Sequence, residues 1–277
     1  MIDISKTVLI CPRNDEESLM ILMIAEKLGL ATVISGQPHG AKLDREKNLL
    51  ARVMDENPEA QTLVIVELPG IGAEKELEEQ GLNVIIIDHH RYDDLDRMRD
   101  KSSLEQFIDL FNVTDAMLSD FGFDSDMVRG VGVIDRGFLW ELPKAGYNGE
   151  KRRKVIEYYR KLTLELGQDR RAREEEAAQV AWESREERDG VIIIHSDEDK
   201  SSIRDAISFI IAKEFEKPTP AIIIQGKRRM YVQDSDSAKD LHEKFGGFTF
   251  GHDRCWGILT DEEPLPNLDE VLEIVVQ

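Results

Sequence analysis

Short apolar runs alternate with longer amphipathic stretches along the first half of the chain. The apolar runs are typical of buried strands, and the intervening stretches repeat their apolar residues with helical spacing. The pattern predicts strands at 7–11, 31–35, 62–67 and 83–88 and helices at 17–29, 43–56, 72–80, 101–110 and 126–140. Strands separated by helices of this length predict a parallel sheet built from right-handed βαβ units.

A second α/β pattern begins near residue 191. It predicts strands at 191–195, 221–226 and 228–233 and helices at 200–214 and 236–244, and the tail segments CWGILT and VLEIVVQ are expected to supply a last strand and an edge element. Because only a short turn at Gly226 separates the runs 221–226 and 228–233, we expect these two strands to be antiparallel.

The stretch between the two patterns, residues 148–189, is helix-forming throughout and dense in charge. Gly167 is a candidate break between two helices. A coiled-coil dimer is an alternative, but the heptads are poor, so we favour an interdomain connector. We therefore predict an α/β protein with an N-terminal parallel-sheet domain at 1–147, a helical connector at 148–189 and a smaller C-terminal α/β domain with a mixed sheet at 190–277.

The charge of the 277-residue chain limits the partners that it can have. Its formal net charge is −20 at pH 7, which argues against a protein that wraps long duplex nucleic acid, because such binding rests on Lys and Arg. A small anionic substrate held in a locally positive pocket or by metal ions is compatible with this charge. We expect neither a membrane span nor a secretory signal, and two cysteines fit a cytoplasmic protein.

The run NVIIIDHH, residues 83–90, concentrates the chemistry of the first half. It predicts a buried strand with Asp88, His89 and His90 at its C-terminal tip, the edge of an open α/β sheet where ligands bind. One carboxylate and two imidazoles at one strand end favour metal binding and acid–base chemistry. The alternative is that Asp88 caps the next turn and that the histidines are surface residues.

Acidic residues stand at or near the ends of the other apolar runs. Cys11 ends the first strand and is followed by Asp15 and Glu17, Glu67 ends the 62–67 strand, and Asp135 follows the run GVGVI. The tips of parallel strands meet at one edge, so these carboxylates would repel each other unless divalent cations cancel their charge. Taken singly, Asp15 or Glu17 is also explained as a helix N-cap or first-turn residue.

In these residues the chain resembles the DHH phosphoesterase superfamily, which includes RecJ-type exonucleases, oligoribonucleases, cyclic-dinucleotide phosphodiesterases and family II inorganic pyrophosphatases. The Asp-His-His motif is intact at 88–90. The first motif of the family, His-x-x-x-Asp-x-Asp, has its counterpart in Cys11, Asp15 and Glu17, the second in Glu67 and the fourth in Asp135. Three of these positions, 11, 17 and 67, depart from the residue usual in the family.

The resemblance implies a role for each of these residues. Asp15, Glu67 and Cys11 would hold one metal ion, and the other would be held by Glu17, Glu67, His89 and Asp135. His90 would lie near the phosphate or contact a metal ligand from behind, and Asp88 would orient the imidazoles. The predicted catalytic residues are therefore Asp88, His89 and His90. Manganese is the expected ion, at one or two positions, with Mg, Co or Zn as alternatives. Cys11 as a thiolate would favour zinc, and as a neutral thiol it would be a small buried apolar residue.

The second half resembles the DHH-associated C-terminal domain. Its glycine-rich stretch FGGFTFGH contains Gly246, Gly247, Gly251 and His252, which the resemblance makes substrate-binding residues. Arg228 and Arg229 lie where the family often supplies phosphate-binding basic residues, and a solvated edge strand explains them equally well. Phe248, Phe250 and Trp256 would stack on bases or pack in the core.

The altered motifs leave three hypotheses for the function. The first is a metal-dependent phosphoesterase acting on phosphodiester bonds of short oligonucleotides or dinucleotides, with an exopolyphosphatase- or pyrophosphatase-like hydrolase as an alternative. The second is a catalytically degenerate relative that binds a nucleotide, and the third is a protein that binds a protein partner. The acidic replacements at 17 and 67 favour the first, and a homodimer is an expectation from the family and the connector.

Overall fold

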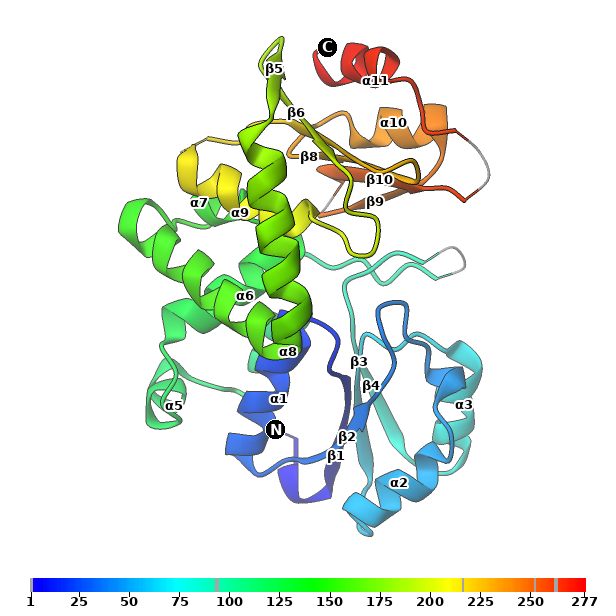
Figure 1. Ribbon diagram of the computed structural model, residues 1–277. Coiled ribbons are helices and arrows are strands. Elements are labelled where there is room, and N and C mark those ends of the chain that lie inside the picture. The colour runs from blue at the N-terminus through cyan, green and yellow to red at the C-terminus, as the bar shows by residue number, and fades with distance from the viewer. Residues whose placement is uncertain (1, 93–94, 216, 252, 262–263) are drawn as a thin grey trace. The chain divides into compact units, whose positions relative to one another are not determined.

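The computed structural model describes residues 2–92, 95–215, 217–251, 253–261 and 264–277 (Figure 1). The chain forms two compact units, Met1–Arg136 with Glu157–Leu166 and Gly137–Ile156 with Gly167–Gln277. The long helix α8 (Gly149–Glu183) is interrupted at Gly167, whose backbone is not helical. The break predicted at Gly167 is therefore present. Residues of α8 belong to both units, and the predicted division into two domains and a connector stays a prediction.

The first unit is built on a four-stranded parallel sheet. The strands are β1 (Thr7–Pro12), β2 (Ala31–Ser35), β3 (Thr62–Val66) and β4 (Asn83–Ile87), in the order β2-β1-β3-β4. Its helices are α1 (Glu16–Leu28), α2 (Leu49–Glu56), α3 (Ile71–Glu79), α4 (Ser103–Leu110), α5 (Asp115–Asp120) and α6 (Ser125–Gly137), with short 3-10 helices at Ile4–Lys6 and Leu43–Arg45. The predicted parallel sheet is confirmed.

The central strands β1 and β3 are buried on both faces, which explains why they are mostly apolar. Successive side chains of a strand point to opposite faces. Leu9 and Cys11 of β1 therefore enter a core formed with α1, α4, α5 and α6, whereas Val8 and Ile10 enter a second core formed with α2 and α3. The two cores fix β1 in the middle of the unit, and its C-terminal tip points toward the first turn of α1.

The second unit contains a six-stranded mixed sheet in the order β5-β6-β7-β8-β10-β9. Its strands are β5 (Glu186–Arg188), β6 (Val191–Ser196), β7 (Ala221–Gln225), β8 (Arg229–Gln233), β9 (Phe248–Phe250) and β10 (Cys255–Leu259). Its further helices are α7 (Glu141–Lys144), α9 (Arg204–Glu214), α10 (Ala238–Phe245) and α11 (Leu268–Val275). Strands β6 and β7 are parallel, and β7 and β8 form the predicted antiparallel pair.

The tail of the chain differs from the prediction. The segment CWGILT forms the expected strand, β10, but VLEIVVQ lies largely in helix α11. Val271 and Leu272 are buried on one face of that helix, and the Asn267 side chain accepts a hydrogen bond from the backbone N–H of Asp269 at its start. The apolar residues thus follow helical spacing from a capped start. Among the described residues, no helix is long and apolar enough to cross a membrane.

Candidate metal centre

The candidate ligands come together at the C-terminal edge of the first unit's sheet. Glu67 directly follows β3, His89 lies two residues after the end of β4, and Glu17 is in the first turn of α1, which follows β1. Asp135 reaches the same place from helix α6. The apolar run that precedes Asp135 is therefore helical: Val128, Val131 and Ile134 are buried at intervals of three residues.

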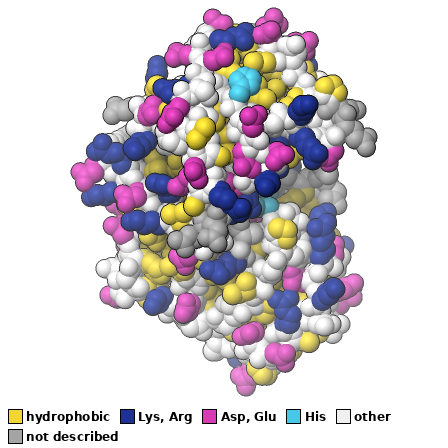
Figure 2. Space-filling model, in the orientation of Figure 1, with side chains coloured by type: hydrophobic (Ala, Val, Ile, Leu, Met, Phe, Trp, Pro, Cys, Tyr) yellow, Lys and Arg dark blue, Asp and Glu magenta, His cyan; other side chains and the backbone are white. Residues whose placement is uncertain are grey.

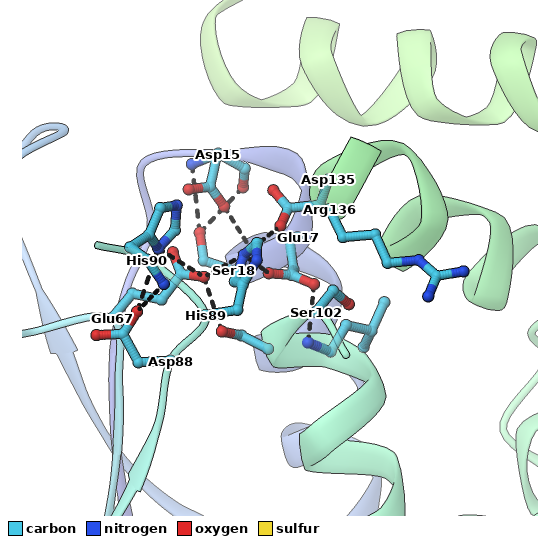
Figure 3. Close-up of polar contacts among 12 residues, drawn as sticks. Asp15, Glu17, Ser18, Glu67, Asp88, His89, His90, Ser102, Asp135 and Arg136 are labelled. Atoms are coloured by element: carbon cyan, nitrogen blue, oxygen red, sulfur yellow. Dashed lines mark hydrogen bonds and ion pairs between the residues drawn. The ribbon is translucent and has the colours of Figure 1, made fainter. Parts of the chain in front are cut away.

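Four side chains form the group that can hold a metal ion: Glu17, Glu67, His89 and Asp135 each offer one ligand atom, and these atoms all lie within 4.8 Å of one another. His89 is central, since its Nε2 lies 2.7 Å from Asp135 Oδ2, 3.4 Å from Glu67 Oε1 and 3.9 Å from Glu17 Oε2. Figure 3 shows the rings and carboxylates pointing toward one another. A second, overlapping group consists of Glu67, His89 and His90.

Three of these ligand atoms are buried and have no hydrogen-bond partner within the described residues: Glu17 Oε2, His89 Nε2 and Asp135 Oδ2. The contact between His89 and Asp135 is short but does not have hydrogen-bond geometry. Buried polar atoms are nearly always satisfied, so three unsatisfied atoms around one point require an explanation. A divalent cation bound by carboxylate and imidazole satisfies all three, so the residues fit a metal ion.

The carboxylates of this group differ in how tightly they hold protons when no cation is present. Burial, followed by the charges of Asp135 and Glu67, raises the pKa of Glu17 well above its usual range. Burial also opposes ionisation of Glu67, but its contacts with His89 and the charge of His90 outweigh it and lower that pKa to about 2. For His89, burial lowers the pKa, but the contacts with Asp135 and Glu67 outweigh burial and raise the pKa to about 10. A bound cation would favour the charged form of every carboxylate.

His90 is oriented by Asp88. The Asp88 carboxylate accepts a hydrogen bond from the His90 backbone N–H at 3.0 Å, faces His90 Nδ1 at 3.2 Å and accepts a hydrogen bond from the Tyr92 hydroxyl at 3.0 Å. Asp88 therefore caps the turn and also holds the ring. The His90 side chain is 47% exposed, whereas that of His89 is 7% exposed. His89 is thus not a surface residue, and His90 is the more exposed of the two imidazoles.

Cys11 and Asp15 are not brought into the four-residue group. The Cys11 thiol is fully buried and donates to the carbonyl oxygens of Pro12 and Ser18 at 3.3 and 3.8 Å, and burial raises its pKa well above the usual range. Asp15 is the N-cap of α1 and accepts a hydrogen bond from the Ser18 backbone N–H at 2.7 Å. Burial and the charges of Glu67 and Asp135 raise the pKa of Asp15 to about 8.

Two residues at the start of α4 contact the ligands and were not recognised in the sequence. The Ser103 hydroxyl donates to Glu67 Oε1, and the Leu104 backbone N–H donates to Glu17 Oε1, both at 2.8 Å. A sequence signal existed, because Ser102 and Glu105 form a capping box that marks the first turn of a helix.

The candidate substrate-binding residues all belong to the second unit. Arg228 is exposed in the β7–β8 turn, 3.5 Å from Asp261, and Arg229 is the first residue of β8. Gly246 and Gly247 precede β9 and Gly251 follows it, all with positive φ. At Gly247 a Cβ atom would lie 2.3 Å from the Gly257 carbonyl oxygen, so packing against β10 requires glycine there. His252 lies outside the described residues.

The three aromatic residues near this glycine-rich stretch differ in exposure. Trp256 is fully buried in the core, and its Nε1 donates to the Gly246 carbonyl oxygen at 2.8 Å. Phe248 is 37% exposed, and the Arg204 guanidinium lies 4.3 Å from the centre of the Phe250 ring. Trp256 is therefore a core residue, Phe248 is exposed, and Phe250 is half-buried against the core with Arg204 over its ring.

Comparisons with known proteins find similarity in structure. No protein-family model and no curated protein matches the sequence. The chain is similar to an exonuclease RecJ bound to manganese, with 14% identity over 92% of this chain and 86% of the other and a TM-score of 0.41. It is also similar to a pGpG-specific phosphodiesterase from Vibrio cholerae, with 12% identity over 98% of both chains and a TM-score of 0.47. An exopolyphosphatase-related protein from Bacteroides fragilis matches with 13% identity over 97% of this chain and 89% of the other and a TM-score of 0.43.

Proposed function

We propose that this protein is a divalent-metal-dependent phosphoesterase that hydrolyses phosphodiester bonds in short oligonucleotides or dinucleotides. The observation that carries the proposal is the set of buried, unpartnered ligand atoms on Glu17, His89 and Asp135, which converge with Glu67 on one point among the described residues. Buried polar atoms in structural clusters are nearly always satisfied, so three unsatisfied atoms at one point favour a ligand. The intact motif at 88–90 supplies the resemblance to phosphoesterases.

Glu17, Glu67, His89 and Asp135 would hold the ion. Three carboxylates and one imidazole suit manganese, magnesium or cobalt better than a thiolate-rich zinc site. Since Cys11 donates its thiol proton to backbone carbonyls, it gives no support to zinc selectivity. When bound, a divalent ion lowers the pKa of a coordinated water and polarises a phosphoryl oxygen.

His90 is suited to contact the phosphate. Burial lowers its pKa, but the hydrogen bond to Asp88 and the charge of Glu67 outweigh it and raise the pKa, which favours the protonated ring. Asp88 engages Nδ1, so the remaining ring nitrogen is the one that can donate a proton or a hydrogen bond to a phosphoryl or leaving oxygen. We assign His89 to metal binding and His90 to substrate.

The surface charge supports short substrates. Basic and acidic side chains are intermingled on the face shown in Figure 2, and the net charge is −20. Long duplex binding needs a continuous basic track. We keep Arg228, Arg229, Gly246, Gly247, Gly251 and His252 as proposed substrate-binding residues, and we propose a cytoplasmic location and homodimerisation.

A second candidate function is nucleotide binding without cleavage. The observation that favours it is the engagement of Asp15 in the α1 cap and of Cys11 with carbonyl oxygens. With these two groups committed elsewhere, the four-residue group offers one metal position. With one ion in place of two, the attacking and the leaving oxygen would not both be stabilised by a metal, and cleavage would be slowed.

A cleavage assay separates the two candidates. The protein, freed of metal with a chelator and then supplied with Mn²⁺, is incubated with a labelled dinucleotide, a short RNA and, separately, pyrophosphate and polyphosphate. We expect release of mononucleotides that is lost in His89→Ala and Asp135→Ala and kept in Asp120→Ala, an exposed aspartate of α5. Binding of the dinucleotide without cleavage supports the second candidate. Hydrolysis of pyrophosphate or polyphosphate alone would make the protein a pyrophosphatase- or exopolyphosphatase-like hydrolase.

A further inference from the structure

We infer that the first turn of α4, residues 102–106, is the positioning element of the metal centre, with Ser103 as its key side chain. This inference rests on the proposed function, because it assumes that Glu17, Glu67, His89 and Asp135 bind a metal ion. The four ligands come from four separate segments of the chain, and the first turn of α4 contacts every one of these segments. The residues of α4 that make these contacts lie outside all the motifs identified in the sequence.

The two glutamates are held through one oxygen each. Leu104 N–H donates to Glu17 Oε1 and Ser103 Oγ donates to Glu67 Oε1, both at 2.8 Å. Ser103 is fully buried, so its hydroxyl makes this contact away from bulk solvent. Glutamate has one more rotatable bond than aspartate, so its carboxylate needs a second contact to occupy one position. Glu17 Oε2 has no hydrogen-bond partner among the described residues and faces His89.

The histidine ligand is held through the backbone before it. Gln106 Nε2 donates to the Asp88 carbonyl oxygen at 3.0 Å and also to the Lys101 carbonyl oxygen at 2.9 Å. The peptide bond between Asp88 and His89 is therefore tied to the start of α4. This contact fixes the point from which the His89 ring extends.

Asp135 is held through its helix. Gly132 is one turn before Asp135 on α6, and a Cβ atom at Gly132 would lie 2.6 Å from Ser102 Oγ. Arg136, the next residue, has its Nε 3.8 Å from Glu105 Oε2 and donates from Nη1 to the Asp100 carbonyl oxygen at 3.1 Å. Helix α6 thus packs directly on the capping box of α4, at a spacing that only glycine allows.

Positioning of metal ligands by neighbouring groups has a measurable effect on affinity. Loss of a group that orients a ligand typically weakens metal binding by about 10–100-fold. We expect Ser103→Ala to weaken Mn²⁺ binding in this range, because the Glu67 carboxylate loses its donor. Gly132→Ala is expected to weaken binding as well, by moving the helix that carries Asp135.

Two matched substitutions serve as controls. Ser208 is as buried as Ser103 and donates to Gln233 Oε1 at 2.7 Å in the second unit, so Ser208→Ala removes an equivalent hydrogen bond away from the site. Gly72 is a helical glycine of α3, and a Cβ atom there would have no described atom within 4 Å, so Gly72→Ala adds the same methyl group in open space. Both controls should bind Mn²⁺ as the wild type does.

The test is titration calorimetry of the full-length variants with Mn²⁺, together with crystal structures of the metal-free wild type and Ser103→Ala. Weaker Mn²⁺ binding in Ser103→Ala but not in Ser208→Ala, with a displaced Glu67 carboxylate, supports the inference. Unchanged affinity, or an unmoved Glu67 carboxylate, overturns it. If the wild type binds no divalent ion, the proposed function fails, and the position of Glu67 in the two crystal structures still decides whether Ser103 holds it.

Discussion

His89 Nε2 lies 2.7 Å from Asp135 Oδ2, yet neither atom makes a hydrogen bond within the described residues. One residue follows strand β4 and the other lies on helix α6. Without a cation, the raised pKa of His89 makes the two groups an ion pair. A divalent ion would take the place of the proton, with both atoms as its ligands. The contact therefore gives the first test of the site.

Asp135→Asn should abolish or strongly weaken binding of Mn²⁺. The amide keeps the size of the side chain but removes the charge that a divalent ion requires, and loss of a direct ligand should cost more than the roughly 10–100-fold typical of an orienting group. Titration calorimetry measures the affinity, and circular dichroism checks the fold. Exposed Asp120→Asn is the matched control. Wild-type affinity in Asp135→Asn would remove this residue from the site.

Asp15→Asn should change Mn²⁺ affinity by less than about tenfold and stabilise the metal-free protein. Asparagine is as good an N-cap as aspartate, so the hydrogen bond from Ser18 is kept. The pKa of Asp15 is about 8 in the folded protein and 3.8 in an ordinary aspartate, so the wild type loses stability as the pH rises from about 4 to 8, and the variant does not. Urea unfolding at pH 5 and pH 8 measures this. A loss of affinity as large as that of Asp135→Asn would instead make Asp15 a ligand.

Cys11→Ala should leave the affinities for Mn²⁺ and Zn²⁺ within about twofold of the wild type. The thiol is fully buried and donates to carbonyl oxygens, so it is a neutral core group. The core loses the packing of the sulfur atom, and the free energy of unfolding should fall by roughly 1 kcal/mol. Parallel titrations with the two metals provide the check. A selective loss of zinc affinity would show that a thiolate reaches the ion.

The ends of the strands were predictable because short apolar runs mark buried strands within a few residues of sequence. Apolar runs fixed the four parallel strands, and the tips of adjacent parallel strands necessarily bring Glu67 and His89 together. The sequence did not show which of the side chains at the strand ends point into the candidate metal site. Asp15 and Glu17 are two residues apart, and only the hydrogen bond from Ser18 commits Asp15 to the helix cap.

Contacts between distant segments are the part of the site that the sequence could not predict. Leu104 and Glu17 are 87 residues apart and Ser103 and Glu67 are 36 apart, and no local pattern pairs them. The helix that carries Asp135 was predicted at 126–140 and is present as α6. Its close approach to the start of α4 was not predictable: a Cβ atom at Gly132 would lie 2.6 Å from Ser102 Oγ.

Asp234 in the second unit should limit stability at neutral pH. It is buried, its Oδ2 has no partner among the described residues, and burial raises its pKa to about 7 despite a hydrogen bond from Trp140 and the charges of Arg254 and Arg152. Between the ordinary aspartate pKa of 3.8 and about 7 the unfolded chain releases this proton before the folded protein does, so the free energy of unfolding falls as the pH rises through this range.

Asp234→Asn should remove that loss and gain roughly 2–4 kcal/mol over the wild type at pH 8, with little gain at pH 4, because each tenfold change in proton affinity corresponds to about 1.4 kcal/mol. Asparagine tolerates the left-handed backbone at this position, where φ is 57°. Exposed Asp189 has a similar φ of 54°, so Asp189→Asn tests the same exchange without burial and should change stability by less than about 0.5 kcal/mol at either pH. Urea unfolding of both variants at the two pH values decides the point. Destabilisation of Asp234→Asn at pH 8 would mean that Arg152 and Arg254 hold the carboxylate in its charged form.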